Sequence, residues 1–164
     1  MTRILYRIDR REFSVGKEIL PPGDHIDFVE TPLQAAEALL RRVAGDRAKL
    51  RSEYLFVFKD LNYTGKYFLG KGGRSIYEVE VDESDILHEA DMMLVNEIAD
   101  VISDTPAAES LAERWLNQET RDSERVEVVV AKAVVKRKLF KPGDGKKIYD
   151  AVYVKKIDLS TILE

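Results

Sequence analysis

The sequence predicts a single α+β domain with a largely antiparallel sheet, three helices and a C-terminal β-hairpin. The chain has 164 residues, the usual length of one domain, so we treat residues 1–164 as a single unit. Segments with alternating apolar and polar residues indicate strands, and three segments with apolar residues at helical spacing indicate helices. Their order along the chain, strands, helix, strands, two helices and a hairpin, is typical of the α+β class.

The first half of the chain begins with a strand and contains one well-marked helix. Apolar and polar residues alternate over residues 4–9, which predicts a short strand, and residues 26–29 predict a second one. Thr31 has the residue type of a helix N-cap, and Pro32 suits the first helical position. Apolar residues then recur at helical spacing until Gly45, a plausible helix end.

The middle of the chain predicts two strands around a glycine-rich connection. Residues 54–58 are continuously apolar and indicate a buried strand. Residues 60–74 contain four glycines, which indicates a mobile loop or a loose hairpin. Residues 75–81 alternate between apolar and acidic residues, as expected for a strand with one buried face.

The second half predicts two helices followed by a long hairpin. A long helix is expected over residues 84–101, and another begins at Thr105. Residues 126–135 predict a strand whose apolar phase slips near Val130, which suggests a β-bulge. The segment Pro-Gly-Asp-Gly at 142–145 predicts a hairpin turn, and residues 147–157 the returning strand.

Charge is distributed very unevenly along the chain. Residues 75–124 hold fifteen acidic and two basic side chains, whereas the segments on either side are both net positive. An acidic face of this kind attracts basic partners. One hypothesis is therefore a non-catalytic interaction module that binds a basic protein partner through residues 75–124. The alternative is that these acids are only the solvated faces of two helices.

The basic C-terminal segment suggests a different partner. Residues 125–157 are rich in lysine and also contain Tyr149 and Tyr153, which have side chains that can stack on bases. This combination favours contact with nucleic acid through the predicted hairpin. The same lysines also have a structural interpretation, because charge on an exposed hairpin prevents edge-to-edge pairing with other sheets.

Composition and motifs exclude several kinds of chemistry. The chain has no cysteine, which rules out thiol catalysis, thiolate metal sites and disulfides. Gly65, Gly70 and Lys71 fit the spacing of a phosphate-binding P-loop, but Gly72 stands where that motif requires a hydroxyl group. No apolar run has the length of a signal core or a membrane span, so we expect a cytoplasmic protein without membrane contact.

A metal site is also not expected. His88, Glu89 and Asp91 form a compact group on the predicted long helix. The chain has only two histidines, and no second one lies near this group. We interpret the three side chains as solvated helix residues.

Arg7, Thr31 and two glutamates form the constellation that carries the most specific prediction. Arg7 lies on the first strand, Thr31 lies at the second strand–helix junction, and Glu78 and Glu80 project from one face of a later strand. Over about residues 1–102 this layout resembles ADP-ribosyltransferase-like domains, in which NAD⁺ binds to a split sheet. The resemblance implies that NAD⁺ is the substrate and that ADP-ribose passes to a macromolecular or small acceptor.

The resemblance also implies roles for individual residues. Tyr6, Arg7, Phe28 and Thr31 would bind NAD⁺, although Phe28 stands where many family members have tyrosine. Glu78 or Glu80 would be the catalytic acid, with Asp85 and Glu97 as alternatives. A carboxylate suits this role because it stabilises the positive charge that develops when the nicotinamide bond breaks. These residues also have structural interpretations, with Arg7 as an ion-pair partner of Asp9 or Glu80 and Thr31 as a helix cap.

Overall fold

The computed structural model describes residues 1–23 and 31–163. The predicted strand at 26–29, together with Phe28 and His25, lies outside the described residues. The chain forms one α+β domain with a seven-stranded antiparallel sheet, so the predicted fold class is confirmed. In the described part of the chain, no helix is both long and apolar enough to cross a bilayer.

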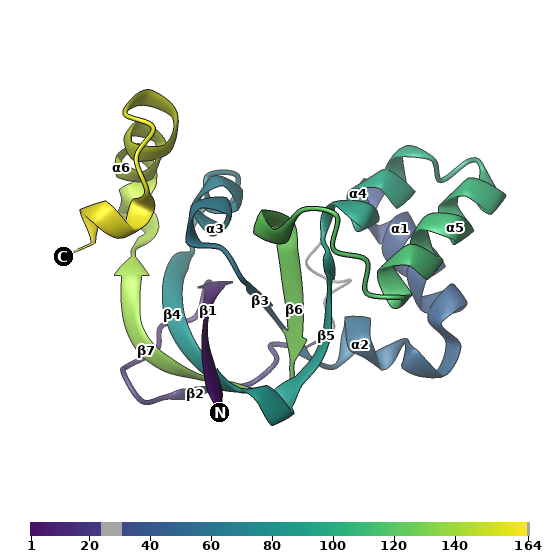
Figure 1. The fold of residues 1–164 in the computed structure, drawn as a ribbon, viewed down its shortest axis with the longest axis horizontal. Helices are drawn as coiled ribbons and strands as arrows, with labels where there is room; N and C mark the ends of the chain where they lie inside the picture. The colour runs from purple at the N-terminus through teal and green to yellow at the C-terminus, as the bar shows by residue number, and fades with distance from the viewer. Residues whose placement is uncertain (24–30, 164) are drawn as a thin grey trace.

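Strands and helices alternate irregularly along the chain (Figure 1). The strands are β1 (Thr2–Asp9), β2 (Glu18–Ile19), β3 (Leu55–Phe58), β4 (Ser75–Asp82), β5 (Ile86–Asp91), β6 (Val126–Val130) and β7 (Ala133–Phe140). The α-helices are α1 (Thr31–Ala44), α2 (Lys49–Ser52), α3 (Leu61–Phe68), α4 (Met93–Asp100), α5 (Thr105–Leu116) and α6 (Gly145–Tyr149). The predicted strands at 4–9, 54–58 and 75–81 and the helices that begin at Thr31 and Thr105 are therefore confirmed.

The sheet consists of two halves that meet along a very short seam. The strand order is β2-β7-β4-β1-β3-β6-β5, and every pairing is antiparallel. β1 pairs with β4 over its whole length, whereas it pairs with β3 only at Tyr6 and Phe58. Beyond that pair, β1 and β3 separate. The half β2-β7-β4-β1 and the half β3-β6-β5 are thus joined at one point of the ladder.

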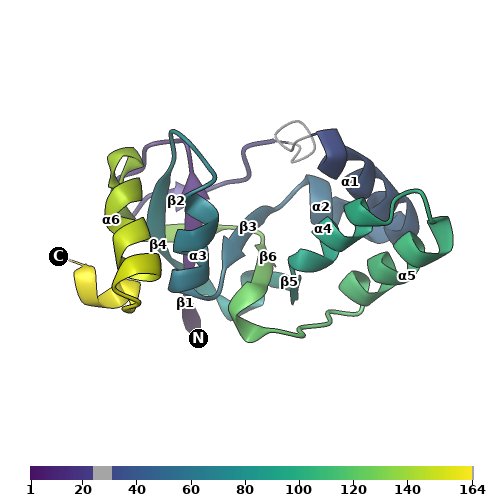
Figure 2. The same ribbon diagram turned by 90° about the horizontal axis from the view of Figure 1, so that it is seen from above.

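Helices pack in two separate groups, one on each half of the sheet (Figure 2). α1, α4 and α5 cover the β3-β6-β5 half around a cluster that includes the buried side chains of Leu40, Leu94 and Trp115. α3 and α6 cover the other half around Phe140 and Ile148. Among the described residues, the two helix groups stand apart, on either side of the place where β1 and β3 separate.

The opposite face of the sheet encloses a third apolar cluster. Leu5 from β1, Val130 from β6 and Val135 from β7 all belong to this cluster and are almost fully buried. β6 and β7 are not neighbours in the sheet, so the strands must bend around a shared interior for these side chains to meet. Figure 1 shows this bending of the strands. The cluster is continuous across the seam between the two halves.

The prediction of a loop or loose hairpin over residues 60–74 is wrong, because this segment contains helix α3. The side chain of Asp60 accepts a hydrogen bond from the Tyr63 backbone N–H and so caps the helix start. Leu61 and Phe68 are buried on the inner side of α3. Gly65 lies within the helix, where its lack of a side chain lets neighbouring residues approach.

The prediction of one long helix over residues 84–101 is also wrong. Its first part is strand β5, which pairs with β6 and buries His88 and Ala90 on alternate positions. The chain then turns, and α4 carries the helical apolar spacing with Leu94 and Ile98. The apolar residues of β5 and α4, taken together, fit the spacing of one continuous helix. Within β5, however, buried residues alternate with more exposed ones, as in a strand.

The predicted C-terminal hairpin does not form. β6 and β7 are separate strands that do not pair with each other, and the slip near Val130 is the end of β6 rather than a bulge. The turn at 142–145 leads into α6, which continues as the π-helical segment Asp150–Val154. Ile148 and Ala151 are spaced as on a helix and are buried against the sheet, so packing favours helix over strand here.

Candidate functional site

A pocket with a cavity volume of about 350 Å³ opens where β1 and β3 separate, between the two helix groups. It draws its lining from the end of β1, from β3 and β6, from α3 and from the loop before β4. The lining residues are Arg7, Ile8, Asp9, Arg10, Arg11, Pro22, Gly23, Tyr54, Phe56, Phe58, Tyr67, Lys71, Arg74 and Glu127. Both halves of the split sheet therefore contribute to one cavity.

Arg7 reaches the pocket through the gap between the strands. Its Nη1 donates a hydrogen bond of 2.8 Å to the backbone carbonyl of Phe56, a ladder position that β1 itself does not pair. Its Nε donates to Asp9, and Arg11 binds the same carboxylate. Burial lowers the pKa of Arg7, while the charge of Asp9 opposes this effect. Arg7 thus connects the two halves of the sheet at the edge of the pocket.

Glu127 is the pocket carboxylate that comes from the other half of the sheet. Its Oε1 accepts a hydrogen bond of 3.0 Å from Nη1 of Arg51, which also binds Glu37 with two nitrogens. Both Arg51 and Glu37 are at most 2% exposed. Burial by itself lowers the pKa of Arg51, but the charges of Glu37 and Glu127 raise it above its ordinary value. Arg51 is therefore a fixed cation outside the pocket lining that orients the Glu127 carboxylate.

Aromatic rings hold Arg51 in this position and also form the pocket walls. The guanidinium carbon lies 4.7 Å from the ring centre of Phe56 and 5.0 Å from that of Trp115. On the pocket side, Phe56 and Tyr67 belong to the lining, and burial raises the pKa of Tyr67 to about 12. Tyr67 is therefore neutral near pH 7 and presents a flat, uncharged ring.

Arg10, Lys71 and Arg74 add three further cations to the pocket lining. Lys71 lies over the ring of Tyr67, with its Nζ 4.9 Å from the ring centre. Desolvation, with a further contribution from the charge of Arg10, lowers the pKa of Arg74. Within residues 1–23 and 31–163, no ion pair with a carboxylate is recorded for Arg10, Lys71 or Arg74. Flat aromatic walls and several cations, beside the arginine-bound carboxylates of Asp9 and Glu127, suit a planar ligand that carries negative charge.

The structure brings only part of the sequence-predicted constellation to this pocket. Arg7 lines it, whereas Tyr6 is half-buried beside it and does not belong to the lining. The register of β1 and β4 pairs Arg7 with Tyr77 and Tyr6 with Glu78, so Arg7 leaves the sheet on the face opposite to Glu78 and Glu80.

The predicted acids have other partners outside the pocket. Glu78 forms an ion pair with Arg137, and Glu80 forms one with Lys136, both across the β4–β7 ladder. Asp85 lies in the turn before β5, and Glu97 on α4 pairs with Arg121. Thr31 is exposed at the start of α1, as expected for a residue at a helix start, and it does not line the pocket.

Histidine at position 88 is a core residue, contrary to the prediction that it is solvated on a helix. Its ring packs against Trp115 with ring centres 4.1 Å apart, and its Nε2 lies 2.8 Å from the Trp115 carbonyl oxygen. Desolvation lowers its pKa below the ordinary value. Asp91 is also fully buried, and it binds Arg121 and Arg125. In the described residues no cluster of acids and histidines is placed to hold a metal ion.

Glu127 and Arg51 are the site residues that sequence reasoning missed. Glu127 is the one charged residue in the run Val-Glu-Val-Val-Val of β6, and it was included only as part of the apolar alternation. A single acid inside an otherwise apolar strand is a signal for a buried, partnered carboxylate. Arg51 carries no comparable signal, because α2 is short and the polar residues Lys49, Ser52 and Glu53 lie beside it in the sequence.

The acidic block at 75–124 is dispersed over β4, β5, α4 and α5. Eight of its fifteen acids form ion pairs with arginine or lysine, many of them from the basic segments on either side. The charge separation along the sequence is therefore partly cancelled in the folded protein.

No protein-family model matches this chain, and no curated protein matches it significantly in sequence.

Proposed function

We propose that this protein binds NAD⁺ in the pocket at the split of the sheet and transfers ADP-ribose to an acceptor, either a macromolecule or a small molecule. The observation that carries the proposal is that Arg7 and Glu127, from the two halves of the sheet, line one cavity. In the resemblance to ADP-ribosyltransferase-like domains, a first-strand arginine and a late acidic residue complete the site. Glu127 takes the role that the sequence suggested for Glu78 or Glu80.

The pocket residues suit the separate parts of NAD⁺. The cavity volume of about 350 Å³ falls in the range of small-molecule sites. The rings of Phe56 and Tyr67 offer flat surfaces for nicotinamide or adenine. Arg10 and Arg74 supply the planar guanidinium groups that bind phosphate oxygens well.

The chain's residues support each change in the transfer step. The bond between the ribose carbon and the nicotinamide nitrogen breaks, and its electron pair leaves with neutral nicotinamide. The ribose carbon gains positive character, which the Glu127 carboxylate stabilises. An acceptor oxygen or nitrogen then bonds to that carbon and passes its proton to Glu127. Arg51 keeps the carboxylate oriented during this step, because its own position is fixed by Glu37 and by two aromatic rings.

The interaction-module hypothesis has less support. An acidic docking face needs a concentrated negative field, and eight of the fifteen acids already pair with cations. A basic protein partner nevertheless stays a possible acceptor of ADP-ribose in this proposal. The cytoplasmic location also stays a prediction, and the lack of cysteine suits it.

The proposal is tested by titrating the purified protein with NAD⁺ while following thermal stability and free nicotinamide. A ligand that binds only the folded state at 100 times its Kd raises the free energy of unfolding by about 2.7 kcal/mol. We expect such stabilisation together with release of nicotinamide. The absence of any stabilisation at millimolar NAD⁺ would contradict the proposal.

Two matched glutamate variants locate the catalytic acid. Glu127→Gln keeps an acceptor for Arg51 and removes the charge, so nicotinamide release should fall by about 10² or more while NAD⁺ still binds. Glu80→Gln removes the same charge from the β4–β7 ladder and should leave the rate within about twofold, because exposed ion pairs contribute little. A large loss in Glu80→Gln with none in Glu127→Gln would show that the acid is misassigned.

A further inference from the structure

The C-terminal helical segment exposes two tyrosines side by side. Tyr149 and Tyr153 are 52% and 48% exposed, and their ring centres are 5.2 Å apart. Tyrosine rings are usually at least partly covered by the protein, because burying them is favourable. A pair of adjacent, half-exposed rings is therefore a feature that needs a functional explanation.

Packing of the inner side of this segment fixes the direction of the tyrosines. Ile148 and Ala151 are buried in the cluster on the β2-β7-β4-β1 half, whereas Tyr149 and Tyr153 lie on the exposed side of the segment. The helix continues from α6 into the π-helical segment Asp150–Val154, and π-helical turns are rare and frequent at functional sites. The segment thus presents both rings to solvent.

Residues 141–158, which contain the two rings, hold five lysines and three acids, so this segment carries a net positive charge. Lys141, Lys146, Lys155 and Lys156 are all exposed. In the part of the chain that the structure describes, none of the four has a recorded ion pair. The surface around the tyrosines is therefore positively charged.

Exposed flat rings among unpaired lysines match one ligand chemistry best. Single-stranded nucleic acid has bases that can stack on aromatic rings and phosphates that bind lysine, whereas the bases of a duplex are already stacked on one another. An acidic protein segment would use the lysines but not the stacked rings. An anionic membrane surface is the competing partner, because Val154 and Ile157 are exposed on the same segment, and the vesicle experiment below separates the two.

We propose that this surface, formed by Lys141, Lys146, Tyr149, Tyr153, Lys155 and Lys156 and called here the tyrosine–lysine face, binds single-stranded nucleic acid. Bases stack on Tyr149 and Tyr153, and the lysines contact the phosphates on either side. This binding does not depend on the pocket or on NAD⁺. It replaces the sequence-based idea of a basic hairpin with a helical surface, because residues 147–157 form no strand.

The test measures fluorescence anisotropy of labelled 20-nucleotide oligothymidylate and oligouridylate, with a 20-base-pair duplex for comparison. We expect the single strands to bind more tightly than the duplex. The variant Tyr149→Leu/Tyr153→Leu keeps apolar area but removes stacking, and it should weaken single-strand binding by about tenfold or more. Unchanged affinity in this variant would overturn the proposal, as would tighter binding of the duplex.

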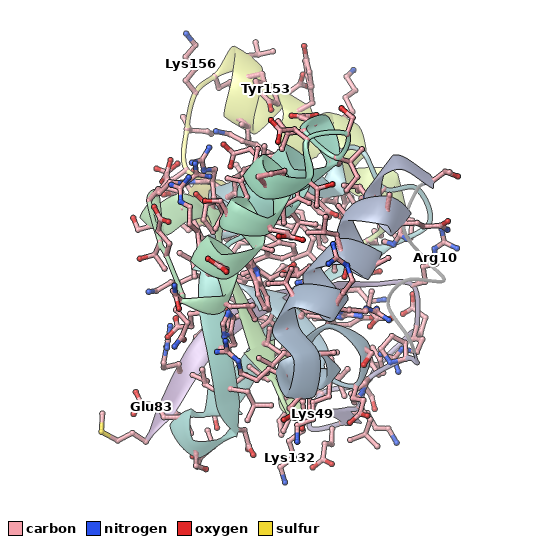
Figure 3. All side chains as sticks on the ribbon, turned by 90° about the vertical axis from the view of Figure 1, so that its right-hand side faces the viewer. Arg10, Lys49, Glu83, Lys132, Tyr153 and Lys156 are labelled. Atoms are coloured by element: carbon pink, nitrogen blue, oxygen red, sulfur yellow. The ribbon has the colours of Figure 1, made fainter. Side chains whose placement is uncertain are left out.

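Matched lysine variants separate a local site from general charge attraction. Figure 3 shows Tyr153 and Lys156 at one end of the molecule and Lys49 and Lys132 at the opposite end. Lys155→Gln/Lys156→Gln should lower the slope of log affinity against log salt by about 1.4, the value for two phosphate contacts with a single strand. Lys49→Gln/Lys132→Gln removes the same charge and should leave the slope almost unchanged. Equal effects of the two pairs would contradict a site at the tyrosine–lysine face.

A membrane control completes the experiment. Sedimentation with vesicles containing phosphatidylserine tests whether the face prefers an anionic lipid surface. Weak vesicle binding that Tyr149→Leu/Tyr153→Leu does not change supports the proposal. Strong vesicle binding without oligonucleotide binding would overturn it. The NAD⁺ titration of the same variants should match the wild type, so failure here is distinguishable from failure of the pocket proposal.

Discussion

Arg51 combines burial, ion pairing and contacts with aromatic rings in a single residue. It is buried, ion-paired with Glu37 and Glu127, and enclosed by the rings of Phe56 and Trp115. A buried charge without a partner is strongly unfavourable, so Arg51 and Glu37 depend on each other. The pocket carboxylate Glu127 depends on Arg51 for its orientation. Stability and function are therefore coupled at this residue.

Substituting one partner of this buried pair should cost far more than substituting both. Arg51→Met removes the cation that hydrogen-bonds the buried carboxylate of Glu37, and it should lower the free energy of unfolding by about 3–5 kcal/mol, even though Arg41 stays 3.8 Å from that carboxylate. Arg51→Met/Glu37→Met replaces both charges with apolar groups and should recover a large part of that loss. Urea unfolding of the two variants and of Glu37→Met measures the coupling. Additive losses would show that the pair does not act as a unit.

At the residue scale, the sequence predicted one member of the candidate site and missed the others. The resemblance to ADP-ribosyltransferase-like domains predicts a first-strand arginine, and Arg7 lines the pocket. The same resemblance predicts a late acidic residue, and it assigns this role to Glu78 or Glu80 on a clearly alternating strand. Strand alternation shows which residues share a face, but not which face meets the pocket. Only the register of β1 and β4 separates Arg7 from these two glutamates.

At the scale of elements, α3 and the C-terminal segment fit together through a glycine. A Cβ atom added at Gly65 would collide with the Leu159 side chain and would press on Ile148 Cγ2 at 3.2 Å. Gly65 therefore lets α3 lie directly on the final turn, Leu159–Ile162. The glycine that suggested a loop in the sequence is in fact a packing residue inside a helix.

Double substitution tests this close approach. Gly65→Ala favours helix by about 1 kcal/mol, yet we expect it to destabilise the protein because it overpacks the contact with Leu159, typically by about 1–3 kcal/mol. In the Leu159→Ala background, where space is available, the same substitution should be neutral or stabilising. Thermal unfolding of the four proteins in this cycle measures the difference. Equal effects of Gly65→Ala in both backgrounds would contradict the packing explanation.

On the scale of the whole molecule, the two halves of the sheet are joined by very few backbone hydrogen bonds but share one apolar cluster. β1 and β3 pair only at Tyr6 and Phe58, whereas the cluster that includes Leu5, Val57 and Val130 extends across the seam. Apolar burial is the main stabilising force, so it should bind the halves into one cooperative unit. The split can then hold a pocket without dividing the domain.

Native-state hydrogen exchange in low concentrations of denaturant tests this cooperativity. We expect amides in the middle of β4 and of β6 to exchange with the same opening free energy, within about 1 kcal/mol. Val57→Ala removes volume from the shared cluster and should lower both values together. Opening of one half at a clearly lower free energy than the other would show two independent units.

The sequence by itself determined the α+β class, the lack of thiol chemistry, most of the strands and the two helices with clear caps. These features depend on composition and on local period, which act within a few residues. Tertiary structure decided that residues 84–101 form a strand and a helix and that residues 147–157 form no hairpin, because packing overrode ambiguous local patterns. It also decided the site. Arg7, Arg51 and Glu127 are far apart in the chain, and only the split in the sheet and the shared cluster beneath it bring them together.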